Sequence, residues 1–202
     1  VIPSYNEKQI TRTLNSLWNA QESDSSVEVF VVVNSSSHSP SYVLKRNQMT
    51  VREIEDWKRH HQGERFAVYP LHLSALPIKD FGAGLARKIG MDEAVSRFNQ
   101  LNRDEGYIIS LDADVEVDEN YFQAIEYIME EDEETNMGIL YFQHPLQGKE
   151  FSDAIYEAVS KYELFLRYYN QGLRWAGFPY AFHTIGSTFF VKAIAYVKQG
   201  GM

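Results

Sequence analysis

Two aspartates, Asp112 and Asp114, directly follow a short apolar run that begins at Tyr107. The run is rich in aromatic and β-branched residues, and its length favours a covered strand over a helix. Residues i and i+2 of an extended chain share one face, so both carboxylates are expected to converge just past the carboxyl end of this strand. Ligands of open α/β sheets bind there, and carboxylate oxygens together with substrate phosphates suit Mg²⁺ or Mn²⁺. The pattern therefore predicts a metal-nucleotide site.

The same residues have a plainer interpretation. Acidic and apolar residues alternate from Asp112 to Asp118. That alternation is also typical of a solvated edge strand that leads into the N-cap of a helix. The Asp-x-Asp pattern alone does not distinguish a metal-nucleotide site from a solvated edge strand. The choice between these two interpretations therefore depends on the surrounding elements.

Length and composition indicate a globular chain. Its 202 residues correspond to one to one and a half domains, and 44% are hydrophobic and 14% aromatic. The 19 basic and 28 acidic residues give a net charge of −9, which argues against a nucleic-acid binder because phosphate backbones require a basic face. A single anionic ligand remains compatible if a metal and local cations meet it. The absence of cysteine excludes disulfides and thiolate metal sites but leaves the redox compartment undecided.

Neither a membrane span nor a signal peptide is visible in the sequence. No run approaches the roughly 18 apolar residues that a span requires. The opening Val1-Ile2-Pro3 resembles the end of a strand, and Gly200-Gly201-Met202 follows directly on a helical stretch, so we expect a fragment truncated at both ends. A cytoplasmic location is the default expectation, with any membrane association supplied by segments outside this sequence.

Strand and helix patterns alternate along the chain, which predicts βαβ units. A capping box at Thr50 predicts one helix start, Asp118 is the expected cap of another helix, and residues 34–37 are expected to form a polar loop. The expected strands cover residues 27–33, 66–71, 107–111, 138–143 and 188–191, and the expected helices cover 10–20, 50–61, 82–99, 118–130, 152–170 and 193–198. This order predicts an α/β fold, Rossmann-like, with a mostly parallel central sheet flanked by helices. We expect one domain over residues 1–202, with a functional but not a domain boundary near residue 137.

Aromatic residues crowd the second half of the chain. Most of them fit core packing, but aromatic faces also stack on sugar rings. Trp175 and Tyr180 are the preferred binding candidates because they fall in an irregular segment with Gly and Pro, and binding residues concentrate on such loops. The histidines show no metal-ligand spacing apart from the adjacent pair His60 and His61, which is expected at an exposed helix end.

As an ordered set, these segments resemble the family 2 glycosyltransferases of the GT-A fold. The resemblance spans nearly the whole chain. The matching segments are 1–7 (VIPSYNE), 82–90 (GAGLARKIG), 111–114 (LDAD), 186–191 (GSTFFV) and Gly200-Gly201.

The resemblance implies a nucleotide-diphospho-sugar donor, such as a UDP- or GDP-sugar, held by a donor half (1–136). It also implies transfer with inversion to a glycan or lipid-linked acceptor, bound by an acceptor half (137–202) in which Trp175 and Tyr180 are the acceptor-binding candidates. Pro3, Tyr5 and Glu7 match positions that line the nucleobase and ribose. Arg87 matches a position beside the nucleotide. Asp112 and Asp114 match the ribose and metal contacts, with Asp114 as the first choice of direct ligand to Mn²⁺ or Mg²⁺. Gly84, at a helix start, is of the type that lets backbone approach a phosphate.

The sequence departs from the family pattern in three places. Val33-Asn34 stands where members usually carry an acid that meets the base; Asn34 can donate and accept hydrogen bonds, so base recognition is expected in altered form. Arg87-Lys88 replaces the usual Arg-Asn. The usual catalytic base lies in a Glu-Asp motif after the Gly-Gly, so we expect it beyond Met202, and we expect this fragment to bind donor but transfer sugar poorly.

Alternatives remain for individual residues and for the whole chain. Glu7 fits a first-turn helix acid, Arg87 an exposed helix cation, and Gly84 a helix-entry residue. A sugar nucleotidyltransferase would carry a glycine-rich loop with Arg and Lys after the first strand, which is missing here. A non-catalytic nucleotide- or glycan-binding module is the second alternative.

Overall fold

The computed structural model describes residues 1–20, 23–61, 63–79, 81–103, 105–132, 134–183 and 185–201. Met202, beyond which the catalytic base is expected, lies outside the described residues. Helices and strands alternate through most of the chain. In order they are β1 (Ile2–Ser4), α1 (Ile10–Asn19), β2 (Val27–Ser36), α2 (Ser41–His60), β3 (Phe66–Leu76), α3 (Ala83–Leu101), β4 (Tyr107–Ser110), α4 (Tyr121–Glu131), β5 (Met137–Ile139), α5 (Asp153–Trp175), β6 (Phe189–Lys192) and α6 (Ala193–Lys198).

The first sheet is parallel, as predicted for an α/β fold. Its strand order is β1-β2-β3, with Ile2 opposite Val31 and Val27 opposite Phe66. Strand β2 lies in the middle and pairs on both sides, which suits its run of consecutive valines.

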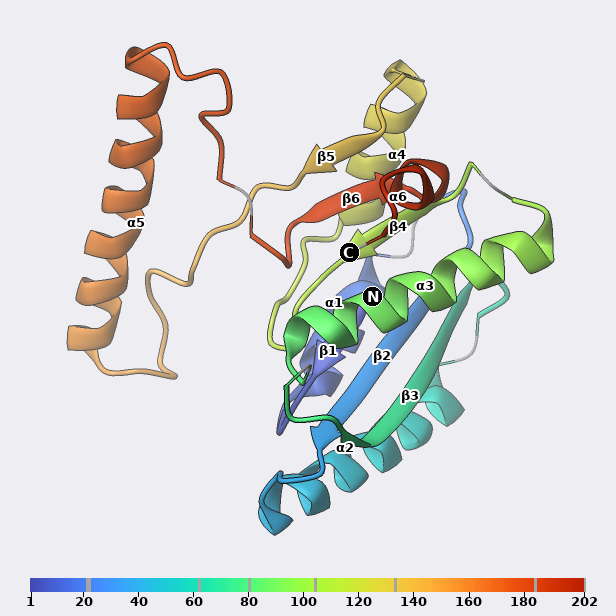
Figure 1. Cartoon of the computed structure of the whole chain (residues 1–202). Helices are drawn as coiled ribbons and strands as arrows, with labels where there is room; N and C mark the ends of the chain where they lie inside the picture. Colours follow the sequence, from blue (N-terminus) through green and yellow to red (C-terminus); the bar gives the residue numbers. More distant parts are fainter. Residues whose placement is uncertain are drawn as a thin grey trace.

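The second sheet, in the order β4-β6-β5, is antiparallel. The two sheets meet at Val1, whose backbone nitrogen donates to the Ile109 carbonyl at 2.7 Å and whose carbonyl accepts from the Leu111 N–H at 3.0 Å. These two bonds flank Ser110 in the pattern of parallel pairing. Strand β4 therefore runs alongside β1, and both strands end at the same edge (Figure 1).

The parallel sheet is covered on both faces. Val29, Val31 and Val33 pack with apolar residues of α1 and α2, whereas Phe30 packs with Met91 of α3. Helix α3 lies across the opposite face from α1 and α2 (Figure 1). Among the described residues, no helix is long and apolar enough to cross a bilayer.

The predicted polar loop at 34–37 was wrong for its first three residues. Asn34 and Ser36 belong to β2 and are buried, with Asn34 opposite Leu73 of β3. Pairing with β3 satisfies their backbone groups, so tertiary context overrides their preference for turns.

The predicted start of α2 at Thr50 was also wrong. The helix begins at Ser41, after Pro40, and Thr50 lies buried within it. The Thr50 hydroxyl donates to the carbonyls of Arg46 and Glu7, at 3.0 and 2.9 Å. The first half of α2 has few apolar positions, so its helical periodicity was too weak to be recognised.

Two further boundaries differ from the predictions. Asn120, rather than Asp118, directly precedes α4; Asp118 contributes only its carbonyl, which accepts the Tyr121 N–H at 3.0 Å. Strand β5 is shorter than the predicted 138–143 segment. The helix predicted at 193–198 is confirmed as α6.

Helix α5 is the largest departure from the predictions. It extends to Trp175, so this residue is helical rather than part of an irregular segment. The helix stands apart from the two sheets (Figure 1), and its apolar residues Ile155 and Phe165 are exposed. Tyr156 and Glu163 are its buried residues instead. Periodicity located the helix but not the direction of its apolar face.

Candidate functional site

An ion pair joins α3 to the end of β4. Arg87 Nη2 lies 2.6 Å from Asp112 Oδ1; the guanidinium is buried, while the Asp112 side chain is 42% exposed. Among the described residues, the buried Arg87 Nε has no hydrogen-bond partner. Helix α3 packs on β1 and β2, and β4 runs beside β1, so the fold itself brings the two residues together. Arg87 thereby orients Asp112 and leaves the second carboxylate oxygen of Asp112 for other partners.

The segment before β6 packs against this pair. Ser110 Oγ donates to the Gly186 carbonyl at 2.5 Å, and a Cβ at Gly186 would lie 2.6 Å from Arg87 Nη1. The absence of a side chain at 186 therefore makes room for the guanidinium. Sequence reasoning placed Gly186 in the acceptor half and missed Ser110; the structure brings both to the donor residues.

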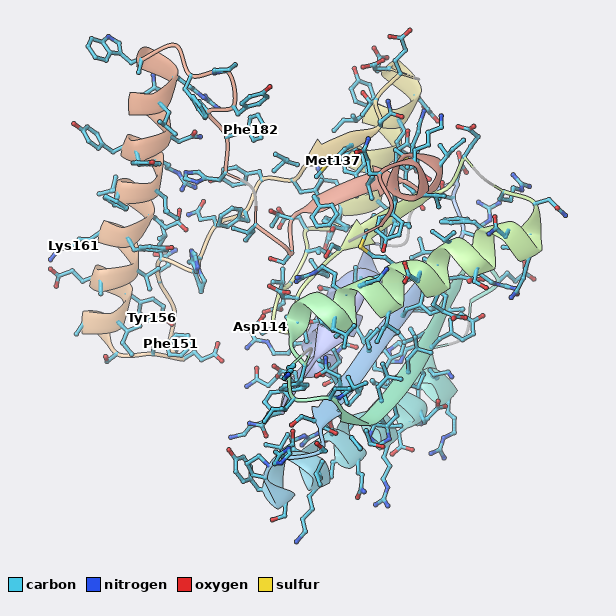
Figure 2. All side chains as sticks on the ribbon, in the orientation of Figure 1. Asp114, Met137, Phe151, Tyr156, Lys161 and Phe182 are labelled. Carbon is cyan, nitrogen blue, oxygen red and sulfur yellow. The ribbon has the colours of Figure 1, made fainter. Side chains whose placement is uncertain are left out.

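Asp114 is exposed, two residues after Asp112. The chain turns at Ala113 and Asp114, and the buried Ala113 carbonyl accepts from Thr13 Oγ1 at 2.8 Å. The extended geometry expected from Asp-x-Asp was therefore wrong, because strand β4 already ends at Ser110. In Figure 2, Asp114 lies on the side of the sheets that faces α5. Within the described part of the chain, no hydrogen bond or ion pair occupies its carboxylate.

Carboxylates such as these are the ligands that a divalent cation takes when a diphosphate or water supplies its other ligands. No described side chain forms a hydrogen bond or ion pair with the Asp114 carboxylate, and only one oxygen of Asp112 pairs with Arg87. Over the described ranges, no group of three or more His, Asp or Glu residues is arranged to hold a metal. Mg²⁺ commonly binds through only one or two carboxylates plus substrate phosphates.

The loop after β1 lies beside the start of α3. Pro3 is buried opposite Val32, whereas Tyr5 is partly exposed and its ring meets that of Phe81 edge to face at 5.1 Å. Gly84 lies in the first turn of α3, where a Cβ would have no neighbour within 4 Å. Packing among the described residues therefore leaves space at Gly84 for a ligand.

A buried asparagine, Asn47 of α2, connects the ends of β1 and β2. Its Nδ2 donates to the Asn34 carbonyl at 2.7 Å, and its Oδ1 accepts from the Asn6 N–H at 2.9 Å. Asn6 adopts a positive φ of 56°, a conformation that asparagine tolerates better than most residues. Sequence reasoning missed Asn47 because this residue precedes the helix start predicted at Thr50, whereas the helix in fact begins at Ser41.

Glu7 has a local structural role. Its Oε1 accepts from the backbone N–H groups of Lys8 and Gln9, both at 2.6 Å. Because Gln9 makes no side-chain capping bond itself, Glu7 supplies an acceptor at the start of α1. This geometry supports the helix-start interpretation of Glu7.

Three buried oxygens lack partners at the carboxyl ends of β1 and β2. They are Ser4 Oγ, Asn34 Oδ1 and Ser35 Oγ, and among the described residues none receives or makes a hydrogen bond. Asn34 is only 1% exposed. Unpaired buried oxygens are rare in native proteins and indicate a place for water or a polar ligand.

The acceptor candidates do not join this site. Trp175 ends α5, and Tyr180 packs against Phe178 and Phe182, with ring centres 5.9 and 6.4 Å apart. Neither contact reaches a donor residue. His183 Nε2 lies 2.7 Å from the Leu166 carbonyl of α5. The ring of His61 stacks on Trp57 at 4.1 Å, which explains the adjacent histidines by packing.

A hollow of about 560 Å³ lies beside the aspartates, between α1 and the segment before α4. Arg12 reaches Glu116 and Glu150 there. Its lining contains none of the donor candidates. The described residues that line this hollow are Arg12, Asn15, Ser16, Asn19, Glu116, Val117, Asp118 and Glu119.

Comparison with known proteins gives one match. A family model described as "Glycosyl transferase family 2" matches residues 1–182. No curated protein and no solved structure matches the chain. The match includes β1, the start of α3 and both aspartates, the segments that form the geometry above.

Proposed function

Because the chain belongs to the family 2 glycosyltransferases, we propose that it uses a UDP- or GDP-sugar as donor and transfers the sugar, with inversion, to a glycan or lipid-linked acceptor. The observation that carries this proposal is the Arg87–Asp112 pair beside the unoccupied carboxylate of Asp114. A buried cation that fixes one acid next to a second, exposed acid is suited to holding a metal-bound diphosphate.

In this proposal the donor lies at the carboxyl ends of β1, β2 and β4. Tyr5 and Pro3 line the nucleobase, Gly84 allows backbone approach to phosphate, and Asn34 offers a buried amide oxygen to the base or ribose. Arg87 acts through Asp112, whose free oxygen is directed to the ribose or metal. Glu7 contributes by fixing the loop after β1.

Asp114, assisted by Asp112, would hold Mn²⁺ or Mg²⁺. The ion neutralises charge on the departing diphosphate. The protein's part is to fix the Asp112 carboxylate before the donor arrives, through Arg87 and the packing of Ser110 and Gly186 around it. No residue of this sequence is assigned as the base that removes the acceptor proton.

We propose that residues 1–202 form one domain rather than two separable halves. Support comes from Gly186, which packs on Arg87, and from β6, which pairs with β4. Trp175 and Tyr180 stay candidates for the acceptor side, on a part of the chain that stands clear of the donor end (Figure 1).

Calorimetric titration of the chain with UDP and with GDP, each with and without Mn²⁺, tests the donor site. Metal-dependent nucleotide binding that Asp114→Ala abolishes would support the proposal. Asp118→Ala is the matched control, since this exposed acid lies four residues further along and should leave binding unchanged. Glycan binding without any nucleotide binding would instead identify a non-catalytic module and overturn the donor site.

A further inference from the structure

Residues 141–183, which we call the satellite, close around α5 through contacts among themselves. The His144 N–H, from the segment before the helix, donates to Glu163 Oε1 at 3.0 Å. From the segment after the helix, His183 Nε2 lies 2.7 Å from the Leu166 carbonyl. Helix α5 therefore carries both flanking segments with it, and the satellite stands apart from the two sheets as one unit (Figure 1).

The two ends of the satellite leave the sheets at the same place. Ile139 of β5 pairs with Phe189 of β6, and the next residue, Leu140, donates its N–H to the Thr188 carbonyl at 2.7 Å. Both connections to the satellite therefore start side by side at this crossing (Figure 1). Two connections at one point restrain rotation about that point only weakly, which is the geometry of a hinge.

A second attachment lies far along the sequence from this hinge, at Arg12 of α1. Arg12 Nη1 lies 3.1 and 3.2 Å from the two carboxylate oxygens of Glu150, in the segment before α5. Across the described ranges, this is the only ion pair between the satellite and the rest of the chain. The same guanidinium pairs with Glu116, and its Nη1 donates to Gln9 Oε1 at 2.9 Å, so groups outside the satellite orient it for Glu150.

Glu150 is fixed to the rest of the satellite. The neighbouring Phe151 donates its N–H to Tyr156 Oη at 3.3 Å, and a Cβ at Gly148 would lie 2.6 Å from the same oxygen. Tyr156 is a buried residue near the start of α5, and Figure 2 shows it next to Phe151 at that end of the helix. Because this loop packs closely on Tyr156, the Glu150 carboxylate moves with the satellite.

We propose that the Arg12–Glu150 pair is a latch that holds a hinged satellite. The two side chains are about half exposed, at 47% and 48%, and an exposed ion pair is weak enough to break and re-form without unfolding. When the pair breaks, the satellite stays attached at the β5–β6 crossing and turns about it. The satellite therefore exists in a latched and an unlatched arrangement, and the ion pair sets their ratio.

The latch ties the position of the satellite to the aspartates. Thr13, next to Arg12 on α1, donates its hydroxyl to the Ala113 carbonyl at 2.8 Å, between Asp112 and Asp114. Two consecutive residues of one helix thus hold the aspartate segment and the satellite. Unlatching would move the satellite relative to Asp114 and change the room for an acceptor beside the donor, a consequence that rests on the proposed function.

The absence of cysteine allows two spin labels to be placed without background labelling. Lys161→Cys on α5 and Glu93→Cys on α3 put the labels at exposed positions, one on the satellite and one outside it, and double electron–electron resonance measures the distance between them. We expect one narrow distance distribution at low salt. Arg12→Met and, separately, Glu150→Gln should add a second distance and raise the ratio of unlatched to latched molecules by about twofold to fivefold. Salt at about 1 M should do the same to the unsubstituted latch and add little in either variant.

Arg59→Met is the matched control, because it breaks another exposed ion pair, with Asp56, that lies within α2 and does not reach the satellite. This variant should keep the narrow distribution. Glu150→Gln preserves side-chain volume and alters only a loop residue, so it tests the latch independently of any effect of Arg12→Met on folding. An unchanged distribution in Glu150→Gln would overturn the latch, and so would an equally broad distribution in the chain with its latch intact. No nucleotide or metal is present, so failure here is distinguishable from failure of the donor site.

Discussion

Arg87 and Asp112, 25 positions apart in the sequence, form a 2.6 Å ion pair in which the cation is buried and the acid is half exposed. The pair couples the second turn of α3 to the residues that follow β4. If the donor binds as proposed, folding and ligand binding depend on the same contact, and its disruption should affect both.

Replacement of Arg87 by methionine should lower both stability and nucleotide affinity. Asp112 would lose its partner, and we expect the free energy of unfolding to fall by about 1–3 kcal/mol. Urea denaturation measures this change. Lys88→Met is the control: it breaks only the surface pair with Asp92 and should cost less than about 1 kcal/mol. Equal losses in the two variants would refute the assigned role of Arg87.

A methyl group at position 186 should displace Arg87. The added Cβ would lie 2.6 Å from Nη1, so Gly186→Ala should weaken the Arg87–Asp112 pair, lower the melting temperature and reduce Mn²⁺-dependent nucleotide binding. The same change in α5, Gly172→Ala, meets no neighbour within 4 Å and should stabilise the helix by up to about 1 kcal/mol. Differential scanning calorimetry of both variants would reveal these opposite signs; a stabilised Gly186→Ala would contradict the packing.

Removal of the Asn47 side chain should release the loop after β1. Asn47→Ala leaves the Asn6 N–H and the Asn34 carbonyl without their partner, and we expect a loss of about 1–3 kcal/mol in unfolding free energy. Nucleotide affinity should also fall, because Tyr5 and Asn34 lie on the connected segments. Gln48→Ala, at the exposed neighbouring position, should be neutral in urea denaturation and in calorimetric titration. A neutral Asn47→Ala would exclude this connection.

Acid should loosen α5. In the folded chain burial raises the pKa of the Glu163 carboxyl, but the His144 hydrogen bonds and the Arg167 charge outweigh it and hold the pKa below its ordinary value of 4.5. The ionised carboxylate therefore stabilises the fold above pH 4.5. This stabilisation is lost as the pH falls through the lowered pKa of the folded state. Hydrogen exchange of α5 amides between about pH 6 and about pH 3, corrected for intrinsic rates, measures the loss. Glu163→Gln should abolish this pH dependence. An unchanged acid response in that variant would assign it to other groups.

The alternating patterns determined the order of elements and the parallel sheet, and they placed Asp112 and Asp114 after a strand, because periodicity and local composition are properties of neighbouring residues. Arg87 was singled out only by the family resemblance. The patterns failed where tertiary contacts compensate for weak local signals. Asn34 is strand because β3 pairs with it, and Thr50 is helical although it resembles a cap.

Only the tertiary structure decided which side chains meet. Asn47, Ser110 and Gly186 join the site through contacts between residues 13 to 99 positions apart, and no local pattern specifies such pairs. The outward direction of the exposed α5 side chains Tyr168 and Trp175 was likewise undetermined by sequence, because an amphipathic helix has the same periodicity whether its apolar side faces a core or the solvent. The contacts of Glu163 with His144 and of the Leu166 carbonyl with His183, both of which reach α5 from outside the helix, decide that direction.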